Sequence, residues 1–354
     1  MTRLLAVEPV LPQHRHSQGE ITDALIPIIG PDRGTERVMR RIHAGCGVDH
    51  RHLALPLADY TALADFGQAN DAFIEAAVDL GAEALSNALE AAGIEPTQVD
   101  IIISTTITGL AVPSLEARIA QRLGLRPDVV RLPIVGLGCM AGAAGTARLH
   151  DLLAGRPEGV AALVSVELCS LTVQRGDHSS ANLVASGLFG DGAGAIVATG
   201  SRHRAAQGVP APRVVASMSK QYPGTAHVMG WDVRASGLRI VLGAEVPELV
   251  RDNVGGDVAA FLGKHGLGIA DVGWWVCHPG GPKVIDSLAE TLGLPREALD
   301  LTTQSLRQVG NLSSASVLHI LRAALDRRPA PGSFGVMMAM GPGFSLELVL
   351  LEAR

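Results

Sequence analysis

The sequence predicts an α/β protein built from two similar halves. Apolar, β-branched segments alternate with alanine-rich helical patterns over residues 100–109, 114–125, 129–138, 145–155 and 159–168. Such alternation is typical of α/β folds. In addition, residues 91–109 and 264–281 share an order of features, in which a helix ending in glycine precedes an acidic turn, an apolar strand and a polar loop. This similarity indicates an internal duplication.

A short surface segment is predicted to connect the two halves. Residues 200–212 (GSRHRAAQGVPAP) are rich in glycine, proline and polar residues, which is typical of a loop. We therefore place the N-terminal half at residues 1–200 and the C-terminal half at residues 201–354. A pseudo-twofold duplication of this kind brings equivalent loops of both halves to one central site.

The composition argues against several classes of protein. With 47% apolar and 18% charged residues, the chain is expected to fold rather than to be disordered. A net charge of −6 and a pI of about 6.0 give no basic surface for nucleic acid. Because no long apolar run or signal-like start occurs, we expect a cytoplasmic protein with no membrane span. The four scattered cysteines predict reduced thiols.

Cys139 stands where an apolar strand runs into a glycine-rich turn and a helix of small residues, RLPIVGLGCMAGAAG. Small neighbours allow a sharp turn and close approach of a substrate, and backbone N–H groups at a helix start favour a thiolate and lower its pKa. The same groups can bind an oxyanion. The alternative is a small buried side chain packed among glycines. Cys139 is therefore a candidate nucleophile whose partners must be found.

Two further residues can serve as those partners. His278 follows an apolar strand and precedes Pro-Gly-Gly-Pro, at a strand end of the kind where α/β active sites collect. Asn311 follows a glycine and opens a helix in GNLSSASVLHIL. Their simpler explanations are a turn histidine and a helix N-cap. In their functional roles, His278 would accept the thiol proton or donate an N–H hydrogen bond to a thioester carbonyl. Asn311 would donate a hydrogen bond from its amide to an oxyanion.

The combination of cysteine, histidine and asparagine favours one chemistry. Because the set has no carboxylate, it lacks a strong base for activating water, which disfavours a hydrolase. It suits acyl transfer followed by decarboxylation, in which Cys139 holds the acyl group and His278 and Asn311 bind the enolate oxygen released from a malonyl thioester. Carbon–carbon bond formation follows.

Five segments together resemble the type III polyketide synthases, the chalcone-synthase-like enzymes. They are GLGCMAGAAG, SGLFGDGAGA, CHPGGPKVID, GNLSSASVLHIL and MGPGFSLELVLL. The resemblance covers residues 12–351. It implies a thiolase-like fold of two duplicated halves in five layers (αβαβα), a homodimer, and coenzyme A thioester substrates with no cofactor and no metal. It also assigns the family's catalytic roles to Cys139, His278 and Asn311.

Within that family, the sequence looks closest to actinobacterial alkylpyrone and alkylresorcinol synthases that use long-chain acyl starters. The loop ITGLAVPSL would send Val112 toward the partner subunit, and it can include a cis peptide bond before Pro113. Thr108, Val112 and Cys169 fall where small side chains open an acyl tunnel in lipid-using relatives. Without the resemblance, ordinary core packing explains these three residues better.

The resemblance also implies a set of pocket residues. Phe189 matches an aromatic residue between the coenzyme A tunnel and the cavity, whereas Ile240 replaces a second one. Trp231 stands where plant enzymes have glycine, so it can block one lobe of the cavity. Ser313, in the GNLSSAS segment, is expected to bind substrate as well.

A basic helix is the expected entrance for coenzyme A. Arg41, in ERVMRRIHAG, matches a family position that contacts the coenzyme A phosphates. Gly45 stands where the family has a further lysine. Arg37 and Arg40 of the same helix are expected to face solvent.

The predicted activity is iterative decarboxylative condensation of malonyl-CoA or methylmalonyl-CoA onto a long-chain fatty acyl-CoA starter, followed by cyclisation to an alkylpyrone or alkylresorcinol. Two alternatives stay open. One is a ketosynthase III-type condensing enzyme that depends on acyl carrier protein. The other is a thiolase-fold protein that binds acyl lipids without catalysis.

Overall fold

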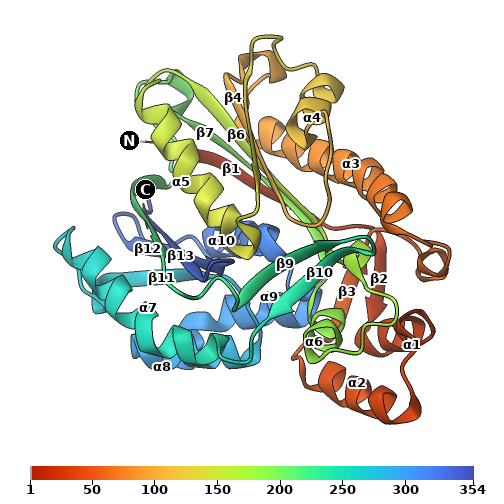
Figure 1. Ribbon diagram of the computed structural model, residues 1–354. Coiled ribbons are helices and arrows are strands. Elements are labelled where there is room, and N and C mark those ends of the chain that lie inside the picture. The colour runs from red at the N-terminus through yellow and green to blue at the C-terminus, as the bar shows by residue number, and fades with distance from the viewer. Residues whose placement is uncertain (1) are drawn as a thin grey trace.

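Figure 1 shows a computed structural model of the protein, which describes residues 2–354. Up to Thr199, the strands are β1 (Arg3–Val10), β2 (His14–Ser17), β3 (His50–Leu53), β4 (Ile101–Thr106), β5 (Val130–Val135), β6 (Val160–Leu168) and β7 (Asp191–Thr199). The helices in this part are α1 (Gln18–Ile29), α2 (Arg33–Gly45), α3 (Phe66–Ala92), α4 (Leu115–Leu123), α5 (Ala141–Ala154) and α6 (Ser180–Leu188).

The remainder of the chain follows a similar order. Its strands are β8 (Arg213–Gln221), β9 (Met229–Arg234), β10 (Gly237–Leu242), β11 (Val272–Cys277), β12 (Phe334–Gly341) and β13 (Ser345–Glu352). Its helices are α7 (Val246–Gly263), α8 (Pro282–Leu292), α9 (Asp300–Val309) and α10 (Ser316–Asp326). Residues 200–212 connect β7 with β8 and contain one short helical turn, η5 (Arg204–Ala206). The division at residue 200 stays a prediction.

The central sheet repeats one topology twice. Its first part has the order β1-β7-β6-β4-β5 and its second the order β8-β13-β12-β11. In both parts the first two pairings are antiparallel and the third is parallel. The two parts join through a single pair, Arg3 and Arg213 on β1 and β8. The predicted duplicated α/β fold is confirmed, and residues 91–109 and 264–281 contain the equivalent strands β4 and β11.

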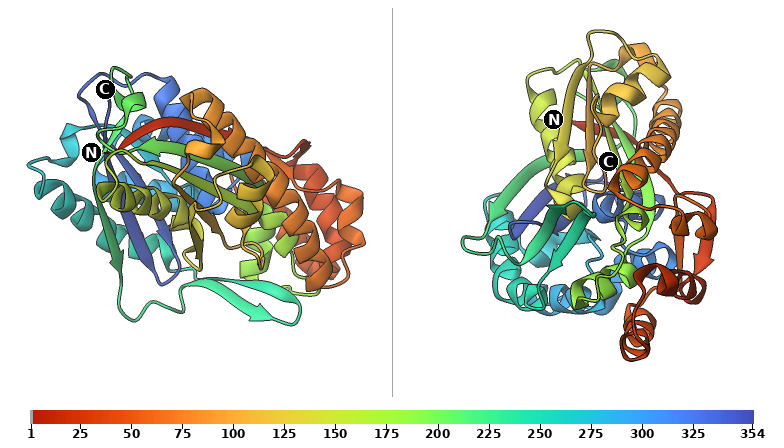
Figure 2. Two further views of the ribbon diagram at one scale, coloured as in Figure 1. Left: turned by 90° about the horizontal axis from the view of Figure 1, so that it is seen from above. Right: turned by 45° about the vertical axis from the view of Figure 1, so that its right-hand side comes forward.

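The helices complete five layers, which can be followed in Figures 1 and 2. Helix α3 packs on the outer face of the first part of the sheet, and α7 and α8 cover the outer face of the second part. Helices α5 and α10 pack between the two parts. Successive side chains of a strand point to opposite faces of the sheet. In β4, Ile102 therefore belongs to the outer core, whereas Ile101 and Ile103 face the middle layer.

The two middle helices approach each other closely at their starts. A Cβ atom on Gly142, in the first turn of α5, would lie 2.1 Å from the backbone oxygen of Ser314, just before α10. Only glycine therefore permits this contact without a shift of backbone. Because Cys139 precedes α5 and Asn311 precedes α10, the same contact brings their segments together.

Two small antiparallel pairs lie outside the central sheet, β2 with β3 and β9 with β10. In Figure 2 the β9–β10 hairpin extends away from the layered core. Among residues 2–354, no helix is both long and apolar enough to cross a membrane.

The close contact at Gly142 predicts a stability effect. Gly142→Ala is expected to lower the free energy of unfolding by about 1–3 kcal/mol, because the added methyl group overpacks the middle layer. Gly256→Ala is the control, since Gly256 lies in α7 with no atom within 4 Å of its hypothetical Cβ. Thermal unfolding of both variants checks the prediction, and equal midpoints would contradict it.

Candidate active site

Residues from both halves line one cavity of about 520 Å³. It is open to the surface and contains most of the side chains that the sequence singles out: Arg41, Cys139, Phe189, Trp231, Ile240, His278, Asn311 and Ser313. Cys139 is partly exposed to it, whereas His278 and Asn311 are buried. The structure therefore brings the predicted catalytic set to one place.

The turn that presents Cys139 depends on a neighbouring loop. Gly138 has a positive φ of 53°, and a Cβ on it would lie 2.6 Å from the ring Cδ of Pro342. Pro342 belongs to the Gly-Pro-Gly segment between β12 and β13. The sharp turn before Cys139 and the C-terminal Gly-Pro-Gly motif thus pack as one unit, which explains why position 138 needs glycine.

The sulfur of Cys139 lies in an environment that disfavours charge. Burial raises the pKa of the thiol to about 12; a hydrogen bond with Ser313 opposes this shift, and the nearby Glu167 adds to it. The sequence predicts the opposite direction, from the position of Cys139 at a helix start. In the unliganded protein the cost of desolvating a thiolate exceeds that benefit, so the cysteine is a neutral thiol that needs a proton acceptor.

His278 can act as that acceptor. Burial lowers the pKa of its imidazole to about 3, so the ring is neutral at physiological pH. The amide nitrogen Nδ2 of Asn311 lies 3.3 Å from Nε2 of His278. Because an amide nitrogen only donates, Nε2 is the unprotonated, accepting atom, and Nδ1 holds the proton. Nδ1 has no hydrogen-bond partner within the described residues.

The orientation of the Asn311 amide is set by its own neighbours. Its Oδ1 accepts a hydrogen bond from the backbone N–H of Ser313 at 2.8 Å, which leaves Nδ2 facing His278. Its backbone is also held on both sides, since its N–H donates to Leu188 and its carbonyl accepts from Gly190, at 2.9 and 3.0 Å. These residues flank Phe189, so the asparagine and the aromatic pocket residue are positioned by one short stretch of paired backbone.

Ser313 shows local strain at the site. Its φ of 48° is unusual for a residue with a side chain and costs about 1–3 kcal/mol. Its Oγ donates to Glu167 at 3.2 Å. Strain of this kind persists only where surrounding contacts compensate for it, and here Glu167 and Asn311 supply them.

Glu167 is a member of the site that sequence reasoning missed. It is fully buried on β6 and also accepts hydrogen bonds from Ser314 Oγ at 2.5 Å, Thr108 Oγ1 at 2.9 Å and the Ile107 N–H at 3.1 Å. Burial raises the pKa of this carboxyl group. The available signal was a single acidic residue inside an otherwise uncharged strand, since β6 (VAALVSVEL) is buried along its whole length.

Three predicted pocket residues do not line the Cys139 cavity. Thr108 lines a separate cavity, where its hydroxyl also accepts from the Leu168 N–H at 2.9 Å. Cys169 lines a third, much smaller cavity beyond Trp231 and Ile240. Val112 is 95% exposed on a loop with a cis Val112–Pro113 bond. Their assignment to an acyl tunnel stays a prediction.

The cavity mouth has two cationic side chains from opposite halves. Arg41 on α2 and Lys283 in the first turn of α8 both line it, and both are exposed. Lys283 was overlooked in the sequence, although it directly follows the conspicuous HPGGP segment. Such charges can attract phosphate groups.

Two family models match consecutive parts of the chain. "FAE1/Type III polyketide synthase-like protein" matches residues 34–210, and "Chalcone and stilbene synthases, C-terminal domain" matches residues 213–353. A 1,3,6,8-tetrahydroxynaphthalene synthase of Streptomyces peucetius subsp. caesius is 50% identical over 352 residues, 99% of this chain and 93% of the relative. A putative chalcone synthase of Bacillus subtilis (strain 168) is 33% identical over 313 residues, 86% of each protein. The chain belongs to the type III polyketide synthase family.

A solved structure agrees with this assignment. The 1,3,6,8-tetrahydroxynaphthalene synthase of Streptomyces coelicolor A3(2), a bacterial type III polyketide synthase, superposes with a TM-score of 0.92 at 28% identity, with 99% of each chain covered. The chain is thus a condensing acyltransferase of a family whose members use coenzyme A thioesters and generally act as homodimers. The family resemblance is confirmed; the narrower likeness to alkylpyrone and alkylresorcinol synthases is not shown by these relatives.

The amide geometry predicts a specific defect. Asn311→Asp retains an oxygen that can accept from Ser313 but loses the Nδ2 donor and adds negative charge. Decarboxylation of malonyl-CoA should fall about 10²–10³-fold, as when an oxyanion donor is removed. Carbon dioxide release measures it, with Asn253→Asp on α7 as the matched control. Wild-type rates in both variants would show that the amide does not bind the enolate.

Proposed function

We propose that this type III polyketide synthase extends an apolar acyl starter, held as a thioester on Cys139, with malonyl-CoA or methylmalonyl-CoA units and releases an alkylpyrone or alkylresorcinol. The observation that supports an apolar starter is the lining of the catalytic cavity. Around the polar catalytic set it is formed largely by Ile42, Val184, Leu188, Met229, Leu242 and Val246. Moving an alkyl chain from water to such an apolar surface lowers its free energy.

Loading of the starter would begin from the neutral thiol of Cys139 and the neutral imidazole of His278. The thiol proton of Cys139 moves to Nε2 of His278, and the sulfur attacks the carbonyl carbon of the acyl-CoA. The carbon–sulfur bond to coenzyme A breaks, and the departing thiolate takes the proton from the imidazolium. We assign the coenzyme A phosphates to Arg41, at the mouth of the cavity.

Extension would use Asn311 Nδ2 and His278 Nε2 as hydrogen-bond donors. Malonyl-CoA loses carbon dioxide, and the enolate oxygen left behind accepts a hydrogen bond from Asn311 Nδ2. His278 donates the second hydrogen bond as the other neutral tautomer, in which the single ring proton is on Nε2 instead of Nδ1. The enolate carbon then attacks the thioester on Cys139, a new carbon–carbon bond forms, and the sulfur leaves. The thioester carbonyl groups accept the electrons throughout, so we propose that no resident cofactor takes part.

Dimer formation fits the exposed loop after β4. Val112 presents a large apolar side chain that is 95% exposed in the single chain. We propose that this loop lies in the interface of a homodimer and that Val112 contacts the partner subunit. Leu110 of the same loop is also exposed, so a partner subunit would bury two apolar side chains there, which supports this assignment.

A second candidate function is favoured by the relatives. Proteins named 1,3,6,8-tetrahydroxynaphthalene synthase are among those most similar to this chain over nearly its whole length. The chain would then use malonyl-CoA as both starter and extender and form a hydroxylated naphthalene. The same cysteine, histidine and asparagine serve both functions, so the difference lies in the starter.

Product analysis distinguishes the two candidates. Purified protein with malonyl-CoA and a series of acyl-CoA starters should yield products whose mass includes the starter chain, and Cys139→Ala should yield none. Mass spectrometry of the extracts measures this. Products formed only from malonyl-CoA, without incorporation of any starter, would replace the proposed function by the naphthalene-forming one. Activity only with acyl carrier protein thioesters would indicate a ketosynthase III-type enzyme instead.

Thiol labelling tests whether the site is catalytic at all. Cys139 should react with iodoacetamide faster than Cys46, Cys169 and Cys277, because it alone among the described cysteines is partly exposed. Prior incubation with an acyl-CoA should protect it. Peptide mass spectrometry over time gives the rates. Equal labelling of all four thiols without protection would favour a non-catalytic acyl-binding protein.

A further inference from the structure

Two side chains on one hairpin separate two cavities. Trp231 on β9 and Ile240 on β10 are paired directly across the hairpin, so they lie on the same face. Both line the Cys139 cavity of about 520 Å³, and both also line the cavity of about 30 Å³ that contains Cys169. Phe189 lines both cavities as well, so Trp231 and Ile240 form the hairpin's part of a partition between the Cys139 cavity and the space behind it.

The partition rests on an element with little support of its own. Strands β9 and β10 form a separate two-stranded sheet, outside the central sheet. Val233 near the tip is 68% exposed. Because an isolated two-stranded hairpin is only marginally stable, its position depends on side-chain contacts with the body of the protein.

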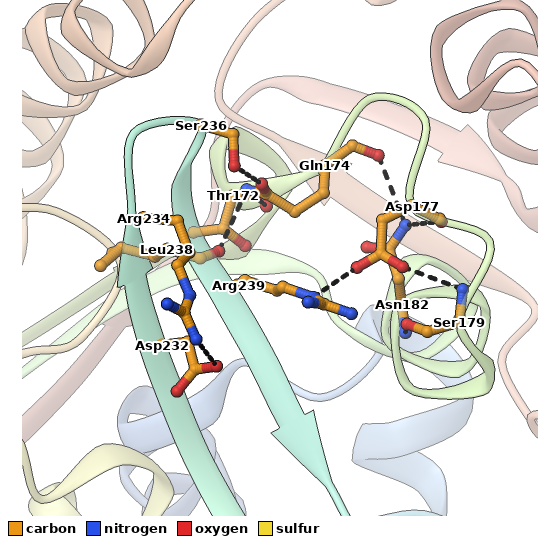
Figure 3. A network of polar contacts seen from close by, with 10 residues as sticks. All are labelled: Thr172, Gln174, Asp177, Ser179, Asn182, Asp232, Arg234, Ser236, Leu238 and Arg239. Atoms are coloured by element: carbon orange, nitrogen blue, oxygen red, sulfur yellow. Dashed lines mark hydrogen bonds and ion pairs between the residues drawn. The ribbon is translucent and has the colours of Figure 1, made fainter.

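Figure 3 shows those contacts, which we call the tether: Gln174 with Ser236 and Leu238, and Asp177 with Arg239. Buried Gln174 accepts from Ser236 Oγ at 2.7 Å and donates to the Leu238 carbonyl at 3.2 Å. Arg239 Nε donates to Asp177 at 2.9 Å. The tether thus holds the turn of the hairpin and the strand that includes Ile240.

The loop side of the tether is itself well anchored. Asp177 accepts from the Ser179 N–H at 2.9 Å, and Asn182 Nδ2 donates to the Asp177 carbonyl at 2.7 Å. Although burial alone would raise the pKa of Asp177, hydrogen bonds from Ser179 and the charge of Arg239 hold it below its usual value. Asp177 is therefore ionised at neutral pH and can pair with Arg239.

The same loop borders the inner cavity. It follows the turn η4 (Cys169–Thr172) and precedes α6, which ends at Leu188, directly before Phe189. The tether thus connects the hairpin to the segments that contain two further pocket residues. A change in the tether is expected to move the partition relative to Cys169, whereas Cys139 and His278 lie outside the tethered segments.

We propose that Gln174, Asp177 and Arg239 are positioning residues that limit the length of acyl chain accepted from Cys139, by holding Trp231 and Ile240 as a closed partition. This inference rests on the proposed use of acyl starters. It concerns chain length, since the tether does not touch the reacting atoms.

The structure offers a matched pair of variants for the test. Arg239→Ala removes the tether's ion pair, whereas Arg234→Ala removes a pair of equal type, with Asp232 at 2.9 Å, that lies wholly within the hairpin. With a series of acyl-CoA starters, Arg239→Ala should shift the ratio of kcat/KM values toward longer chains by about threefold, within the factor of about five available from an exposed ion pair. Arg234→Ala should leave the ratio unchanged, and Arg239→Lys should restore much of the wild-type profile.

A double variant shows whether the effect acts through the partition. Trp231→Ala opens the partition directly, so adding Arg239→Ala to it should shift the chain-length profile no further. Independent shifts that simply add, or an Arg239→Ala profile identical to wild type, would overturn the proposal.

A second measurement does not require any turnover. N-Ethylmaleimide should label Cys169 faster in Arg239→Ala than in wild type or Arg234→Ala, because the reagent can pass the loosened partition. Equal labelling in all three proteins overturns the tether proposal even if no starter is accepted. Faster labelling together with products formed from malonyl-CoA alone would retain the tether as a limit on cavity size and reject only the acyl starter.

Discussion

The contact between the starts of α5 and α10 is the constraint on which the site depends. At Gly142 the backbone of one middle helix comes so close to Ser314 that a methyl group would collide with it. Cys139, the proposed nucleophile, precedes the first helix, and Asn311, the proposed amide donor, precedes the second. In the proposed mechanism, a duplicated fold therefore gives its two halves different roles at one central position. Small residues in this layer thus allow the segments of Cys139 and Asn311 to approach each other, in addition to allowing dense packing.

Burial determines the protonation of the resting site. It raises the pKa of Cys139 and lowers that of His278, so both groups are neutral before a substrate arrives. The same low polarity strengthens hydrogen bonds to an enolate once it forms. Asn311 is held by backbone contacts with the segment around Phe189, and it needs no reorganisation to donate. In the proposed mechanism, charge is thus disfavoured until the reaction creates it beside the Asn311 amide, a donor that is already in place.

The proposed catalytic set and the proposed limit on product size rest on different elements of the structure. Cys139, His278 and Asn311 are held by the central sheet and by helices packed on both of its faces. Trp231 and Ile240 belong to a hairpin outside that sheet. Because the hairpin contacts the body mainly through side chains, its substitutions can alter the cavity with little effect on the catalytic geometry. This separation is consistent with a family whose members share a reaction and differ in products.

The sequence alone determined the duplicated α/β fold, the family and the candidates Cys139, His278 and Asn311, because strand periodicity, glycine-rich turns and short motifs are local. It missed Glu167 and the tether, whose meaning depends on partners far along the chain, such as Ser314 and Arg239. It also gave the wrong direction for the pKa of Cys139, since a helix start is visible in a sequence and the burial of a sulfur atom is not. Desolvation and cavity walls arise only when distant segments pack, so the tertiary structure decided them.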